Sequence, residues 1–108
     1  MTLEQARQAV ARDLADPSYA SVLGAALEHR RWWVEQWAEG EPFLTCLLAQ
    51  DVQEAVQARE PLWPPCSEPS CPQVGRHPLV VEPDLGTDPF WLCERTGLPV
   101  AAVGSLRP

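Results

Sequence analysis

The sequence predicts an α+β fold, in which a helical body of residues 1–60 precedes a small β-meander module of residues 61–108. Apolar residues recur at helical spacing through the first part, whereas the second part contains short apolar runs of strand type. Ten of the twelve prolines also lie in residues 61–108, where they interrupt loops and strands rather than helices. We therefore expect two structurally different parts in one small protein.

The first helix is expected to begin at Leu3. Thr2 and Gln5 fit a capping box, in which the Thr2 side chain caps the helix and Gln5 reaches back to the Thr2 amide. A stripe of apolar residues follows on one face, and Asp16-Pro17 should end the helix. The stripe consists of Leu3, Ala6, Ala9, Val10, Ala11 and Leu14.

A second helix should follow directly and end at Gly40, which is expected to be its left-handed C-terminal residue. Trp33 and Trp37 are four residues apart, so they share one face of this helix. Trp32 lies about 100° away from that face. We therefore expect Trp33 and Trp37 to be buried, and Trp32 to lie at the junction with the C-terminal module or at an oligomer interface.

Pro42 is expected in the first turn of a third helix, which Pro61 stops. Three helices joined by short turns predict a compact antiparallel arrangement. Beyond them, turn signals separate three short runs, which predict a three-stranded meander that is too thin to be stable alone. The runs are Leu79-Val80-Val81, Phe90-Trp91-Leu92 and Val100-Ala101-Ala102-Val103.

Four candidate ligands for a soft metal lie in the C-terminal module: Cys66, Cys71, His77 and Cys93. The first three belong to a proline-rich loop. Cys93 ends an apolar run, as in a zinc knuckle, although the second knuckle cysteine expected near Thr96 is missing. Three thiolates and one imidazole form a complete tetrahedral set for Zn²⁺, and a closed set is structural rather than catalytic. So small a module needs such a staple, so we expect a zinc-stapled meander.

Other interpretations of these residues stay open. Cys66 and Cys71 can form a local disulfide under oxidising conditions. Cys93 can be a small buried hydrophobe at a strand end, and His77 can be a surface loop residue. Cys46 lies in a helical apolar run, so we expect it in the core or at a helix–helix contact rather than in a metal site.

Four motifs follow one another in the module: Leu62-Trp63-Pro64-Pro65-Cys66, His77-Pro78-Leu79, Trp91-Leu92-Cys93 and Thr96-Gly97-Leu98-Pro99-Val100-Ala101. Together they resemble the zinc-ribbon-type tail of small uncharacterised proteins from GC-rich bacteria. The absence of Lys, Ile and Asn, whose codons are AT-rich, agrees with such an origin. The resemblance covers about residues 62–104 and implies a metal-stabilised β-hairpin module without an activity. Cys71 and the long gap before His77 depart from a simple ribbon.

The net charge and the absence of catalytic motifs reduce the number of possible functions. The net charge of -7 disfavours non-specific binding to nucleic acid and to anionic membranes. No Ser-His-Asp pattern, His-Glu-x-x-His motif or phosphate-binding loop is present. The leading expectation is a non-enzymatic protein-binding or adaptor protein whose acidic charge suits a basic protein partner. Trp32 and Arg31 are the candidate partner-binding residues, and self-association is another use of this surface.

Two other functions remain as alternatives: a small metal-dependent enzyme or accessory subunit, and a nucleic-acid-binding zinc ribbon. Residues 61–108 contain more acidic than basic residues, which disfavours the ribbon that binds nucleic acid. The N-terminus lacks the basic and apolar regions of a signal peptide, and no apolar run approaches the length of a membrane span. We therefore expect a cytoplasmic protein with reduced thiols.

Overall fold

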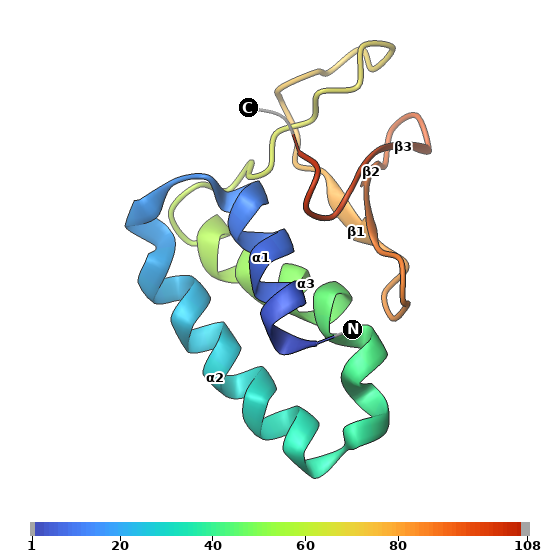
Figure 1. Ribbon diagram of the computed structural model, residues 1–108. Helices are drawn as coiled ribbons and strands as arrows, with labels where there is room; N and C mark the ends of the chain where they lie inside the picture. The colour runs from blue at the N-terminus through green and yellow to red at the C-terminus, as the bar shows by residue number, and fades with distance from the viewer. Residues whose placement is uncertain (1, 107–108) are drawn as a thin grey trace.

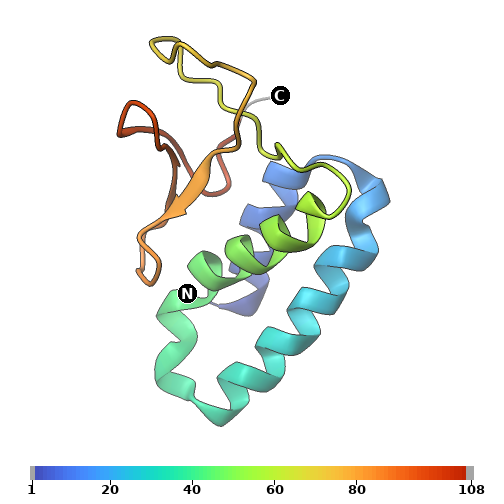
Figure 2. The same ribbon diagram turned by 180° about the vertical axis from the view of Figure 1, so that it is seen from behind.

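The computed structural model describes residues 2–106 and has an α+β architecture (Figure 1). Helices α1 and α3 lie between α2 and a three-stranded antiparallel sheet, as the views from the front and from behind both show (Figures 1 and 2). The strand order is β1-β2-β3, so the predicted fold class is confirmed. The regular elements are α1 (Leu3–Leu14), α2 (Ala20–Gln36), α3 (Leu44–Gln57), β1 (Val80–Glu82), β2 (Phe90–Cys93) and β3 (Leu98–Ala102).

Local side-chain chemistry sets the first two helix starts. The predicted capping box of α1 is present, because Thr2 Oγ1 accepts from the Gln5 amide at 3.1 Å and Gln5 Oε1 accepts from the Thr2 amide at 2.8 Å. A 3₁₀ turn, η1 (Pro17–Tyr19), leads into α2. Asp16 caps this turn by accepting a hydrogen bond from the Ser18 amide at 2.9 Å.

Between α2 and α3 the chain forms the 3₁₀ helix η2 (Ala38–Phe43), which also contains Pro42. The prediction that Gly40 adopts a left-handed conformation is wrong, and so is the placement of Pro42 in the first turn of α3. Gly40 is instead buried beneath two indoles: a Cβ atom there would lie 2.4 Å from Trp33 Cη2 and 2.8 Å from Trp37 Cε3. This glycine is needed for close packing rather than for backbone freedom.

The tryptophans in the last turns of α2 and at its C-cap depart from the predicted pattern. Trp37 is 42% exposed, because its backbone has left the helix (φ -142°) and its side chain no longer continues the helical stripe. It packs edge-to-face on the partly buried Trp33 at 5.2 Å and stacks on Phe43 at 6.3 Å. Trp32 is 59% exposed. It cannot lie at the junction with the sheet, since α2 is on the far side of α1 and α3 (Figure 1).

One hydrophobic core joins the helices to the sheet. At its centre Trp91 of β2 is 1% exposed and packs edge-to-face on Trp63 at 5.7 Å. The indole nitrogen of Trp91 donates to the buried carboxylate of Asp13 on α1 at 2.8 Å. Asp13 also accepts from the amides of Gly104 at 2.6 Å and Leu106 at 2.9 Å. This carboxylate therefore ties α1 to both the sheet and the segment that follows it.

Helix α3 holds the C-terminal part through three glutamines spaced three and four residues apart. Their side-chain amides donate to backbone carbonyls of the C-terminal part that lie outside the strands. The pairs are Gln50 with Asp84 (2.7 Å), Gln53 with Leu79 (2.7 Å) and Gln57 with Trp63 (3.0 Å). A polar stripe of α3 thus positions the module against the helices.

Candidate metal centre

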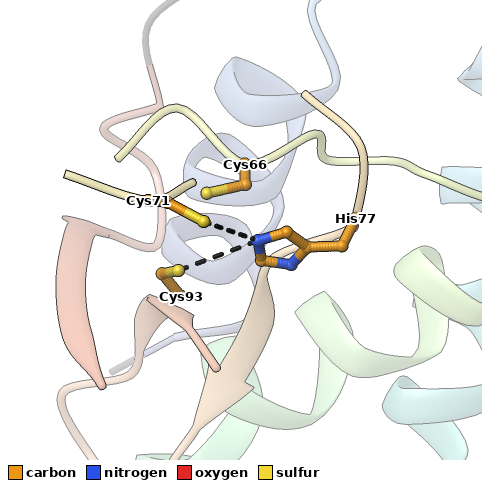
Figure 3. A group of neighbouring side chains, drawn as sticks. All are labelled: Cys66, Cys71, His77 and Cys93. Carbon is orange, nitrogen blue, oxygen red and sulfur yellow. Dashed lines mark hydrogen bonds between the residues drawn. The ribbon is translucent and has the colours of Figure 1, made fainter. Parts of the chain in front are cut away.

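The four predicted ligands, Cys66, Cys71, His77 and Cys93, come together between the proline-rich loop and the end of β2 (Figure 3). All four are buried, and their ligand atoms lie within 4.8 Å of one another. His77 Nε2 lies 3.4 Å from Cys71 Sγ and 3.7 Å from Cys93 Sγ. Metal bonds of about 2.3 Å to sulfur and about 2.0–2.1 Å to nitrogen, at about 109°, place these atoms about 3.5 Å apart. The cluster therefore has the size of a site for one tetrahedral ion.

The proline-rich loop is a hairpin whose two arms carry ligands. The arms pair across Pro65 and Pro78, and the Cys66 amide donates to the His77 carbonyl at 2.9 Å. The Gly75 amide donates to the Cys66 carbonyl at 2.9 Å. Gly75 has a φ of +78°, which residues with a side chain rarely adopt. This pairing brings Cys66 and His77 side by side although they are distant in sequence.

Each cysteine of the cluster accepts a hydrogen bond from the backbone amide two residues further along the chain. Such bonds favour the thiolate, which is the form of cysteine that binds metals. The Sγ–amide pairs are Cys66 with Glu68 (3.4 Å), Cys71 with Gln73 (3.4 Å) and Cys93 with Arg95. The three turns after the cysteines therefore have the same role in supporting the ligands.

The thiols of Cys93 and Cys66 differ in acidity. Hydrogen bonds from the Thr96 side chain and from the amides of Thr96 and Arg95 lower the pKa of Cys93 to about 6. Burial raises the pKa of Cys66 to about 11, and the neighbouring charge of Cys93 acts in the same direction. At neutral pH the metal-free centre thus holds a thiolate at Cys93 and a thiol at Cys66, so metal binding must displace the Cys66 proton.

The imidazole of His77 is oriented for metal binding through Nε2. Its Nδ1 lies 3.0 Å from the Pro78 carbonyl oxygen, which can only accept, so Nδ1 carries the proton. Nε2 is then unprotonated and faces the sulfur atoms of Cys71 and Cys93 (Figure 3). His77 is 8% exposed, so its interpretation as a surface loop residue is wrong.

No cysteine of residues 2–106 forms a disulfide, and this includes Cys66 and Cys71.

The sequence model of one protein family matches residues 1–103, which include the helices and the whole cluster. The chain belongs to this family, described as a domain of unknown function (DUF8819). No curated protein and no solved structure matches the chain. Within residues 2–106, no helix of this DUF8819 member combines the length and the apolar character that crossing a membrane requires.

Cys46 of this DUF8819 chain lies apart from the cluster, in the core as predicted. Its thiol donates to the Pro83 carbonyl at 3.1 Å, and Gln50 Nε2 approaches its sulfur at 3.3 Å. Cys46 therefore supports the turn between β1 and β2 from α3.

Two residues that support the centre were missed at the sequence level. Thr96 donates a hydrogen bond to the Cys93 sulfur. Asp13 holds β2 in position through Trp91. A signal for Asp13 was present, because it lies four residues after the buried Ala9 and three after the buried Val10, on the same face of α1. A charged residue at a core position indicates a buried partner.

Proposed function

We propose that the chain is a non-enzymatic protein-binding or adaptor protein, in which a structural zinc ion joins the hairpin of residues 64–79 to the sheet. The closed ligand set is the main support for this proposal. Four buried side chains could supply a complete tetrahedral set to one ion, which would leave no position for water or substrate, as in structural rather than catalytic sites. Three thiolates also favour zinc over the hard cations Mg²⁺, Ca²⁺ and Mn²⁺.

The weakness of the sheet gives the metal a structural role. Its strands have three, four and five residues, so few ladder hydrogen bonds hold the module. An ion bound to the hairpin and to Cys93 would cross-link these two segments of the module (Figure 3). Structural zinc contributes about 10–16 kcal/mol in small peptides, which is comparable with the entire net stability of a domain, about 5–15 kcal/mol.

The turn after β2 supports a zinc-ribbon-like classification of the module. The Gly97 amide donates to the Cys93 carbonyl at 2.8 Å, and Gly97 has a φ of +74°, as the tight turn of a zinc knuckle requires. The hairpin supplies the other three ligands. We infer a variant ribbon, with one ligand from the knuckle and three from the hairpin.

Metal content and two cysteine variants test the structural zinc site. The purified protein should carry about one equivalent of zinc. Cys93→Ser should lose the metal and loosen the C-terminal module while the helical circular dichroism signal largely remains, because the closing ligand is gone. Cys46→Ser is the matched control: it removes a buried thiol outside the cluster and should retain the zinc. Zinc well below half an equivalent, together with freely titrating thiols, would contradict the proposal.

The adaptor role is supported by charge and by exposed side chains. The net charge of -7 suits a basic protein partner. Trp32 and Arg31 are exposed on α2, and we propose that they face this partner. The test is a pulldown from host lysate with the parent chain and with Trp32→Ala. A partner retained by the parent and lost by the variant supports the role, and no retained partner contradicts it.

A further inference from the structure

The C-terminal half of α2 carries an exposed indole bordered by carboxylates, at the end of the molecule away from the sheet (Figure 1). Trp32 is 59% exposed, which exceeds the exposure of the other large apolar side chains described in residues 2–106. Glu28 lies four residues before it and Glu35 three residues after it, and both are exposed. At these spacings the two carboxylates lie beside the indole on the helix surface.

The largely exposed indole of Trp32 has a ring contact with His29. His29 stacks on it with a centroid separation of 6.4 Å and an interplanar angle of 26°. Around the helix axis His29 lies about 60° from Trp32 in one direction, whereas Glu28 and Glu35 lie about 40–60° away in the other. The two carboxylates therefore lie on the other side of Trp32 from His29 around the helix.

The surrounding segment adds negative charge. Glu39 and Glu41 follow in η2 and are exposed. Arg30 is turned inward, where it pairs with Asp51 of α3 at 2.5 and 2.9 Å and lies over the Trp33 ring at 5.2 Å. Arg31 is then the other basic residue of this segment. The surface is electrostatically complementary to a cation.

We propose that Trp32, Glu28 and Glu35 form a binding site for an arginine side chain in a basic segment of the protein partner. A planar guanidinium can stack on the exposed indole while its N–H groups donate to the carboxylates. Arginine suits this combination better than lysine, since it stacks and forms bidentate hydrogen bonds. This inference rests on the proposed protein-binding function and specifies the chemistry of the partner.

Arg31 provides an internal check on the site. It is three residues after Glu28 and four before Glu35, so it is the cation of this helix nearest to both carboxylates. The partner's arginine competes with it. Removing Arg31 should therefore strengthen binding by about twofold, the opposite of the effect expected if Arg31 itself anchored an acidic partner.

The test measures binding of a fluorescently labelled peptide of nine arginines to the full chain by anisotropy, at physiological salt. Trp32→Ala should weaken binding by at least about fivefold, and Glu28→Gln or Glu35→Gln by about threefold. Glu54→Gln makes the same charge change on α3, and Leu85→Ala removes another exposed apolar side chain. Both control variants should bind like the parent. A nine-lysine peptide should bind more weakly than the arginine peptide.

Three results would overturn the site. The first is that the parent does not bind the peptide, and the second is that Trp32→Ala binds it as well as the parent. The third is that Glu54→Gln weakens binding as much as Glu28→Gln, because this would indicate attraction to net charge alone. Sedimentation tests another occupant: a dimer of the parent that Trp32→Ala dissociates would assign this surface to a second copy. A lysate partner that Trp32→Ala still retains would overturn this site and leave protein binding intact. Zinc content, measured for every variant, reports on the metal centre separately.

Discussion

Replacing Asp13 with Ala tests how the helices hold the C-terminal module. The substitution removes the acceptor of three hydrogen bonds, from Trp91 Nε1 and from the amides of Gly104 and Leu106. The Trp91 donor is buried, so leaving it unpaired costs about 1–3 kcal/mol. The two amides are partly buried and can regain water, which reduces their loss to about 1 kcal/mol each. We expect a total destabilisation of about 3–5 kcal/mol.

A loss of this size is a large fraction of the net stability of a small domain, about 5–15 kcal/mol. It should lower the melting temperature by about 12–20 °C. Urea unfolding of the zinc-loaded protein, followed by circular dichroism and tryptophan fluorescence, measures the change in free energy. Asp88→Ala is the control, because it removes a carboxylate at an exposed position and should change stability by less than about 0.5 kcal/mol.

A double-mutant cycle isolates the Asp13–Trp91 hydrogen bond from the other two. Trp91→Phe removes the indole donor, so Asp13→Ala should cost about 1–2 kcal/mol less in that background. The packing lost with the indole cancels in the cycle. A coupling energy near zero, or a total cost of Asp13→Ala below about 1 kcal/mol, would refute the view that this carboxylate holds the module.

Zinc affinity should fall at least about tenfold per pH unit between about pH 8 and pH 6, because the Cys66 thiol must release its proton to bind the metal. Burial raises the pKa of this thiol to about 11. Competition with a chelating dye measures the affinity, and an affinity that does not change with pH would contradict the prediction. Gly40→Ala should cost about 1–3 kcal/mol in urea unfolding, since its Cβ would lie 2.4 Å from Trp33, and an unchanged midpoint would show that the indole moves freely. Gln53→Ala should lower the free energy of unfolding by about 1–2 kcal/mol and increase hydrogen exchange in β1, because the Leu79 carbonyl loses its donor. Amide protection in β1 equal to that of the parent would argue against a role of the glutamine in positioning the sheet.

The helical part shows which structural features can be predicted from local sequence patterns. The capping box at Thr2 and the start of the second helical segment after Asp16 were predicted, because both depend on side chains within three residues of the amides they cap. Gly40 and Trp37 were predicted wrongly. Their conformations depend on aromatic packing between α2 and η2, which a pattern of apolar spacing does not describe.

The candidate metal site was likewise predictable only where it depends on residue types and not on folded geometry. The members of the cluster could be predicted, since three cysteines and one histidine are residue types suited to a structural zinc. The support of the ligands could not, because the amide two residues after each cysteine donates to sulfur only when the turn has folded. Thr96 was noted only as the place of a missing cysteine, whereas it donates a hydrogen bond to the Cys93 sulfur.

The sequence by itself determined the order of elements, the strand runs and the four residues that could form a metal centre, because periodicity and residue chemistry are local properties. Only the tertiary structure decided which surfaces meet. Asp13 and the glutamines of α3 bind groups that lie between 6 and 93 positions away in the chain. The exposure of Trp32 also follows from tertiary packing, since α1 and α3 rather than α2 cover the sheet. These long-range contacts depend on how the faces of the helices and strands pack against one another. The spacing of apolar residues along the sequence does not specify that packing directly.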